Sequence, residues 1–185
     1  YPHDAADHRL DDDLAAAGFG IDDIDAVFQS HLHVDHAGGL EWFAGTDTPV
    51  YVHERELEFA YYDAVAGAGD GGYLRADFDH DLNWVPLTRD RETHFADLEF
   101  VRLPGHTPGL TGSVLHLETE TLLFTGDQAA LPENYEAGVP PGGDFIWGKT
   151  EWRASRHHLR EIERQHDATV VFGHDRGGLA DARSS

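Results

Sequence analysis

The 185-residue sequence contains no cysteine and no methionine, and lysine occurs only once, at Lys149. Without cysteine, disulfide scaffolds, thiolate metal sites and cysteine nucleophiles are excluded, so a metal ion could be held only by nitrogen and oxygen ligands. No apolar run approaches the ~20 residues that a membrane-spanning helix needs, and no basic segment followed by an apolar stretch opens the sequence. We therefore expect a soluble protein without a membrane partner.

Positive charge is also scarce, because 13 basic residues stand against 35 acidic ones and the formal net charge is −22. A nucleic-acid-binding surface needs clustered basic side chains, so this balance excludes a nucleic-acid partner. At low salt such a charge destabilises the compact state by self-repulsion, which molar salt screens. Together with the aspartates at 11–13, the charge predicts a cytoplasmic protein of a salt-adapted organism.

The hydrophobic content, 40% of all residues, is sufficient for one core, so we expect a single domain over residues 1–185. Amphipathic spacing predicts helices over 9–17, 54–65 and 150–165, the last with Thr150 as its N-cap. Short apolar runs predict strands at 26–29, 50–53, 85–87, 98–103, 113–117, 121–124 and 168–172. The fold class is therefore α/β with several antiparallel strands, and residues 67–83 are expected to form a surface loop.

A dense group of histidines directly follows the first predicted strand, in the string Ser-His-Leu-His-Val-Asp-His-Ala-Gly-Gly at 30–39. His31 and His33 are two residues apart, so in extended backbone their side chains project to the same side. Asp35 and His36 follow at a turn. Three imidazoles and one carboxylate can begin two neighbouring metal sites but can complete neither, so ligands from elsewhere in the chain are required.

Three candidates for these remote ligands each follow a glycine near the end of a predicted strand. They are His106 in Pro-Gly-His-Thr-Pro-Gly, Asp127 in Phe-Thr-Gly-Asp and His174 in Phe-Gly-His-Asp. The glycine lets the backbone turn sharply beside a metal ion. The other histidines are interpreted as solvated or core side chains: His3, His8, His53, His80, His94, His116, His157, His158 and His166.

The string His-Leu-His-Val-Asp-His at 31–36 resembles the HxHxDH signature of the metallo-β-lactamase superfamily, and His106, Asp127 and His174 match its later ligands in order. Within that superfamily the sequence is most similar to the N-acyl-homoserine lactonases, through the Pro-Gly-His-Thr-Pro-Gly turn, segment 133–140 and the Phe-Gly-His-Asp ending. The resemblance implies a metallo-β-lactamase-like αββα sandwich. Because the 30 residues before His31 are predicted to be mostly helical, we expect a domain that is incomplete at its N-terminus and lacks part of its N-terminal sheet.

The same resemblance implies two divalent metal ions, with Zn²⁺ expected and Co²⁺, Mn²⁺ or Fe²⁺ as alternatives for nitrogen and oxygen ligands. It assigns His31, His33 and His106 to one ion, Asp35, His36 and His174 to the second, and Asp127 to both. A hydroxide bridging the ions would attack the lactone carbonyl, and Asp35 would act catalytically by passing a proton to the ring oxygen. The expected partner is a small lactone, and a homodimer is left open.

The sequence departs from the lactonases at one position, and other functions remain as alternatives. Ala130 stands where similar lactonases often carry a tyrosine that contacts the substrate, and Tyr135 is the nearest phenol. A glyoxalase-II-like thioesterase, or another hydrolase of the same fold, is one alternative, although with 11 residues after His174 we expect no C-terminal glutathione-binding domain. A β-lactamase is disfavoured because many use a cysteine at the second metal. A domain whose metal is only structural is the other alternative.

Four aromatic side chains could line an acyl-binding pocket or belong to the core, and the sequence leaves this open: Trp42, Phe43, Tyr61 and Tyr62. The glycines at 142–143 and the segment 145–147 could form either a substrate-facing loop or an ordinary surface loop.

Overall fold

The computed structural model describes residues 9–67, 72–142 and 146–175, and these residues form two β-sheets with helices outside them. The first sheet is parallel and has the order β1 (Val27–Phe28), β2 (Pro49–His53), β3 (Asn83–Leu87). The second sheet runs β4 (Arg91–His94), β5 (Leu98–Arg102), β6 (Thr111–His116), β7 (Thr121–Phe124), β8 (Thr169–Val171). Its strands are antiparallel except that β8 runs parallel to β7.

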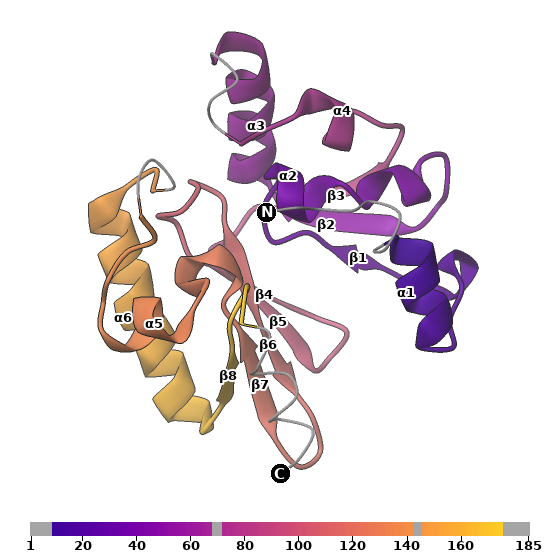
Figure 1. Ribbon diagram of the computed structural model, residues 1–185. Coiled ribbons are helices and arrows are strands. Elements are labelled where there is room, and N and C mark those ends of the chain that lie inside the picture. The colour runs from indigo at the N-terminus through magenta and orange to yellow at the C-terminus, as the bar shows by residue number, and fades with distance from the viewer. Residues whose placement is uncertain (1–8, 68–71, 143–145, 176–185) are drawn as a thin grey trace.

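The helices divide between the two sheets. Figure 1 shows α3 and α4 over the three-stranded sheet, and α6 along the five-stranded sheet with α5 beside it. The α-helices are α1 (Leu10–Ala16), α2 (Val34–Ala37), α3 (Glu54–Ala66), α4 (Arg75–Phe78), α5 (Pro132–Glu136) and α6 (Lys149–His166). Three 3₁₀ turns, η1 (Ile21–Asp23), η2 (Leu40–Phe43) and η3 (Gly126–Ala129), complete the set. No helix among the described residues is long and apolar enough to cross a bilayer.

The alternation of side chains along β2 explains why this sheet is covered on both faces. Val50 and Val52 are fully buried in a cluster with Ala60 of α3 and Phe78 of α4. Tyr51, between the two valines, points the other way and packs its ring against Phe100 of the second sheet, with centroids 5.8 Å apart. One face of the sheet therefore meets helices and the other meets β5.

Strand β5 shows the same division from the other side. Phe100 stacks on Phe28 of β1, with ring centroids 4.3 Å apart. Its neighbour Val101 joins a second core cluster that includes Leu159 and Ile162 of α6. The order of layers is therefore helix, sheet, sheet, helix, and the expected αββα sandwich is confirmed.

Most predicted elements are present, and the differences have simple causes. β4 escaped prediction because its sequence, Arg-Glu-Thr-His, is polar, as suits a strand at the edge of a sheet. The segment 67–83, expected to be a loop, contains the short helix α4. The expected N-cap at Thr150 is wrong, since α6 begins one residue earlier at Lys149 and is capped by Gly148.

Strand direction brings distant parts of the chain to one edge of the five-stranded sheet. Strands β5, β7 and β8 all point the same way, because β6 is antiparallel to both β5 and β7 and β8 is parallel to β7. Their carboxyl ends therefore lie at a common edge. The end of β1 meets this edge, where the Thr111 N–H donates a hydrogen bond to the Ser30 carbonyl at 3.0 Å.

Candidate metal centre

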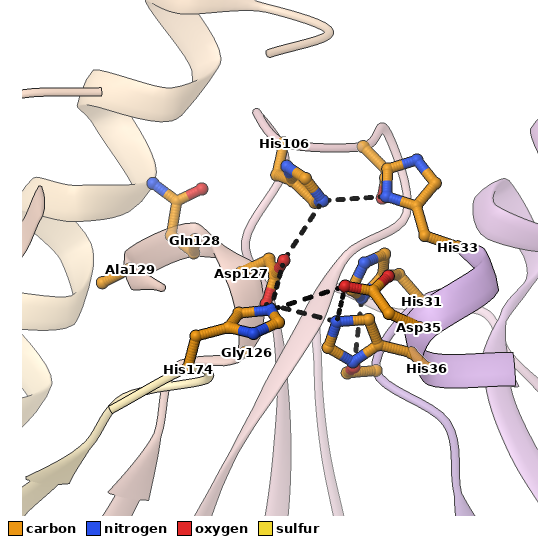
Figure 2. A network of polar contacts seen from close by, with 12 residues as sticks. His31, His33, Asp35, His36, His106, Gly126, Asp127, Gln128, Ala129 and His174 are labelled. Carbon is orange, nitrogen blue, oxygen red and sulfur yellow. Dashed lines mark hydrogen bonds and ion pairs between the residues drawn. The ribbon is translucent and has the colours of Figure 1, made fainter. Parts of the chain in front are cut away.

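Three imidazoles meet at this edge, on loops that follow strands of the two different sheets. We call this group the three-histidine cluster: His31, His33 and His106. Their donor atoms lie within 4.8 Å of one another. Figure 2 shows His33 and His106 facing each other, and their Nδ1 and Nε2 atoms are 2.9 Å apart. The sequence string after β1 supplies the first two histidines, and the turn after β5 supplies the third.

A second group of donors, the carboxylate cluster, lies beside the first and consists of Asp35, His36, Asp127 and His174. Its donor atoms also lie within 4.8 Å of one another. Asp127 lies between the two groups, since its Oδ1 is 3.4 Å from His36 Nε2 and its Oδ2 is 3.6 Å from His106 Nε2. The structure thus gathers all seven side chains that the sequence singled out.

Several buried nitrogen and oxygen atoms in these clusters, which could ligate a metal ion, form no hydrogen bond. Among the described residues, His31 Nε2, His36 Nε2 and Asp127 Oδ1 have no hydrogen-bond partner. Leaving such atoms unpaired in the interior costs about 1–3 kcal/mol each. A cation would use these lone pairs, so the donor set fits divalent metal ions held by nitrogen and oxygen.

The protonation states in the clusters favour a cation. Burial, with the neighbouring His36 and His106, holds the pKa of His31 well below its usual range. Burial and His106 likewise lower the pKa of His33 to about 4. Both imidazoles are therefore neutral near pH 7, which is the form that ligates metals.

Asp127 is ionised in spite of its surroundings. Burial alone would raise the pKa of its carboxyl, but the hydrogen bond from His174 Nε2, at 3.2 Å, and the nearby imidazole of His36 outweigh burial and hold the pKa well below its usual range. The same hydrogen bond to Asp127 raises the pKa of His174. The carboxylate cluster is thus anionic at its buried end.

Glycines let the three remote ligands approach. Gly105 has a φ of 150° and Gly126 a φ of 52°, both in the region that favours glycine. A Cβ on Gly173 would lie 2.8 Å from Asp127 Oδ1. Gly105 and Gly126 thus adopt conformations that favour glycine, and Gly173 leaves space beside Asp127 that a side chain would fill.

One buried carboxylate beside the clusters, that of Glu56, has no signal in the sequence. Glu56, in the first turn of α3, is fully buried and accepts hydrogen bonds from the Leu32 N–H, at 3.0 Å, and the Tyr73 hydroxyl, at 2.8 Å. The Tyr73 ring packs against His33, with centroids 4.5 Å apart. A single glutamate in a helix and a tyrosine in a glycine-rich segment carry no motif, so neither could have been identified from spacing.

Tyr135 does not face the clusters. It is buried in the core beneath α6, and its hydroxyl donates to Glu163 Oε2 at 2.6 Å. At the position that similar lactonases give to tyrosine, the Ala130 carbonyl accepts the His174 N–H at 2.8 Å. The centre therefore has no phenol from either position.

The aromatic side chains left open by the sequence fall into both classes. Phe43 is a core residue, and Tyr61 is partly buried with its hydroxyl on Asp79. Tyr62 and Trp147 are exposed and line a surface cavity of about 440 Å³ beside the turn that carries His106. His3, His8 and residue 145 lie outside the described residues.

Comparison with known proteins agrees with this architecture. The profile of the Metallo-beta-lactamase superfamily matches residues 1–174. N-acyl homoserine lactonase AttM of Rhizobium radiobacter is 35% identical over 172 residues, which are 89% of this chain and 63% of the relative. N-acyl homoserine lactonase AiiA of Bacillus thuringiensis subsp. kurstaki is 30% identical over 177 residues, 94% of this chain and 65% of the relative.

A solved structure of an N-acyl homoserine lactone hydrolase, with the product N-hexanoyl-L-homoserine bound at the catalytic metal center, has a TM-score of 0.79 and 26% identity to this chain. The match covers 96% of this chain and 65% of the solved one. The chain thus spans less than two thirds of the length of these relatives. By the profile match, the fold and the ordered HxHxDH string, the chain belongs to the metallo-β-lactamase superfamily.

Proposed function

We propose that the protein is a metal-dependent hydrolase that opens the lactone ring of N-acyl-homoserine lactones. The observation that carries the proposal is the gathering of seven donor side chains into two adjacent clusters. The relatives AttM and AiiA, which bear the name N-acyl homoserine lactonase, support the choice of substrate.

Two divalent ions are proposed, one in each cluster. The three-histidine cluster would hold the first, and Asp35, His36 and His174 the second. Asp127 would bridge them, which its position between His36 and His106 supports. Imidazole and carboxylate donors suit Zn²⁺, our first choice, although Co²⁺, Mn²⁺ or Fe²⁺ accept the same donors.

When bound, such ions supply Lewis acidity, which makes water more acidic and a lactone carbonyl more electrophilic. The reaction adds one water molecule across the ring ester. The water oxygen bonds to the carbonyl carbon, the bond from that carbon to the ring oxygen breaks, and the ring oxygen takes a proton to become a hydroxyl. The products are one carboxylate, one hydroxyl and one released proton.

Asp35 is suited to move the proton in this reaction. Its Oδ2 lies 3.7 Å from both His36 Nε2 and His174 Nε2, and its side chain is 53% exposed. A carboxylate that borders both the cluster and solvent can take a proton from the attacking water and deliver it to the ring oxygen. Asp35 would thus serve as both a ligand and the catalytic acid–base.

The test combines metal analysis with a pH-stat assay, because each lactone opened releases one proton. At high salt, the protein should bind about two equivalents of Zn²⁺ and hydrolyse hexanoyl-homoserine lactone faster than an S-acyl-glutathione. Turnover of the thioester without the lactone would favour the glyoxalase-II-like alternative. Stoichiometric metal with no turnover of either would favour a structural metal.

A matched pair of variants ties the activity to the clusters. His106→Ala should lose one equivalent of metal together with lactonase activity, a loss of at least 100-fold in kcat/KM. His157→Ala removes an imidazole that is 74% exposed on α6 and should change neither. Full metal and activity in His106→Ala would show that this ligand is misassigned.

A further inference from the structure

Glu56 is an unusual residue for a core. Its side chain is 0% exposed, and the groups that donate hydrogen bonds to it are neutral. Burial raises the pKa of this carboxyl. The hydrogen bonds that it accepts lower the pKa, and the one from Thr107 has the largest effect among them. Burying a carboxylate without a cation costs several kcal/mol, which hydrogen bonds offset only when the geometry is good.

The donors to Glu56 come from both loops that carry the three-histidine cluster. Oε1 accepts the N–H of Leu32, the residue between His31 and His33. Oε2 accepts the hydroxyl of Thr107, which follows His106, at 2.5 Å. The two oxygens of one carboxylate therefore join a loop from the three-stranded sheet to a loop from the five-stranded sheet.

Two further contacts strengthen this junction. The Tyr73 hydroxyl donates to Oε1, and its ring packs against His33. The Gly109 N–H also donates to the carboxylate, and a Cβ at Gly109 would overlap the backbone nitrogen of Glu56. Within the described part of the chain, every donor to Glu56 therefore either borders a histidine of this cluster or lies in the turn that carries one.

We propose that Glu56 is the positioning residue of the three-histidine cluster, holding His31, His33 and His106 in register for a metal ion that it does not touch. The inference rests on the metal centre proposed above. In metalloproteins, residues that hold the ligands without touching the metal ion fix the orientation of those ligands. Their loss typically lowers metal affinity about 10–100-fold. None of the hydrogen bonds to Glu56 comes from the carboxylate cluster, so the effect is confined to one of the two ions.

Glutamine cannot replace Glu56 in this role. A carboxylate only accepts hydrogen bonds, whereas an amide presents an NH₂ group on one side. If that group takes the Oε1 position, it opposes the Leu32 N–H, which cannot reverse. If it takes the Oε2 position, the Thr107 hydroxyl must accept a hydrogen bond where it now donates one, so the hydrogen bond between the loops is altered. Glu56→Gln therefore disturbs at least one loop with almost no change in side-chain volume.

The experiment titrates metal-free protein with Zn²⁺ in competition with a chromophoric chelator. The wild-type protein should bind two equivalents. Glu56→Gln should bind one equivalent with unchanged affinity and the other about 10–100-fold more weakly. Glu58→Gln, an exposed carboxylate on the same helix that pairs with Arg55, is the matched control and should bind both equivalents as the wild type does.

A double variant identifies which equivalent is weakened. Glu56→Gln combined with His106→Ala should bind its remaining equivalent as tightly as His106→Ala alone, because both changes act on the same cluster. Tyr73→Phe removes one donor and serves if Glu56→Gln does not fold, which urea unfolding of the metal-free proteins will show. It should weaken the same equivalent, by a smaller factor.

Three results would overturn the inference: unchanged affinity for both equivalents in a folded Glu56→Gln protein, equal weakening of both, or a further loss in the double variant. Unchanged binding by Tyr73→Phe, when Glu56→Gln is unfolded, also counts against it. Failure of the wild-type protein to bind two equivalents is a different outcome, which overturns the proposed metal centre itself.

Discussion

At the scale of single residues, Tyr73 and Tyr135 each use the phenol hydroxyl to bind a glutamate of the protein itself. Tyr73 donates its hydroxyl to Glu56 and Tyr135 donates to Glu163. Burial, together with the hydrogen bond to Glu163, also raises the pKa of Tyr135 beyond its usual range. Neither hydroxyl is free to contact a substrate carbonyl, so both residues act through packing and hydrogen bonding.

Tyr135→Phe tests this interpretation. The change removes one hydrogen bond to a partly exposed glutamate, so we expect the free energy of unfolding in urea to fall by about 1 kcal/mol. The kcat for hexanoyl-homoserine lactone should stay within about twofold of the wild type, since the lost hydroxyl is bound to Glu163 and makes no contact in the transition state. Tyr62→Phe, at a side chain that is 69% exposed, is the control for stability. A tenfold fall in kcat with unchanged stability would instead indicate that Tyr135 contacts the substrate.

Residue spacing predicted the seven donors because the string at 31–36 and the three Gly-preceded ligands are contiguous patterns. Glu56 and Tyr73 are parts of no such pattern. Their importance comes from packing, which brings α3 and the segment before α4 against two loops distant in sequence. The sequence pattern therefore indicates the ligands themselves, but not the residues that hold those ligands in place.

At the scale of elements, periodicity located α6 and β2 because each has a clear apolar pattern, with Trp152, Leu159 and Ile162 buried on one face of α6. It missed β4, whose polar edge position needs no apolar face, and the four-residue helix α2, which is too short to show a period. The pairing order of the two sheets could not be read from the sequence, since it depends on contacts between strands. Fold class was thus predictable, but register was not.

The turn from β5 to β6 depends on a close approach to α6. A Cβ at Gly105 would overlap the backbone of Trp152, and the Gly105 carbonyl accepts the Gly148 N–H at 2.9 Å. The turn is therefore pressed against the start of α6, and His106 is the next residue. Any displacement of this contact would move a ligand.

Gly105→Ala should therefore lower both stability and metal affinity. We expect a loss of about 1–3 kcal/mol in the free energy of unfolding, from backbone strain at a φ of 150°, and a weaker equivalent of Zn²⁺. Urea unfolding of the metal-free protein and chelator competition measure the two effects. Gly142→Ala, at a glycine with open space around it, should change neither. A variant with wild-type stability and metal affinity would show that the turn can accommodate a Cβ without moving His106.

At the scale of the whole molecule, the net charge of −22 is the dominant electrostatic feature. Several of the few basic side chains are already paired, such as Arg102 with Asp90 and Arg75 with Asp79, so they do little to neutralise the remaining acids. Repulsion among exposed acids acts over the Debye length, which falls from about 10 Å at 0.1 M salt to about 3 Å at 1 M. The folded state should therefore gain from salt.

We predict that the urea midpoint rises when KCl is increased from 0.1 M to 2 M, by an amount equivalent to a few kcal/mol in the free energy of unfolding. Sucrose at the same osmolality, which stabilises without screening charge, is the control and should give a smaller rise. Equal effects of the two solutes, or a fall in KCl, would contradict the interpretation of the charge as an adaptation to salt.

The division of the donors between the two sheets sets the order in which the centre can be completed. Strands β1–β3 and the string at 31–36 come from one continuous stretch of chain, and His106, Asp127 and His174 come later, the last after β8. The chain is synthesised from its N-terminus, and a domain generally folds as a unit. His174, the last donor to be synthesised, closes the site, so acquisition of a full complement of ions would mark a chain in which both sheets have already docked.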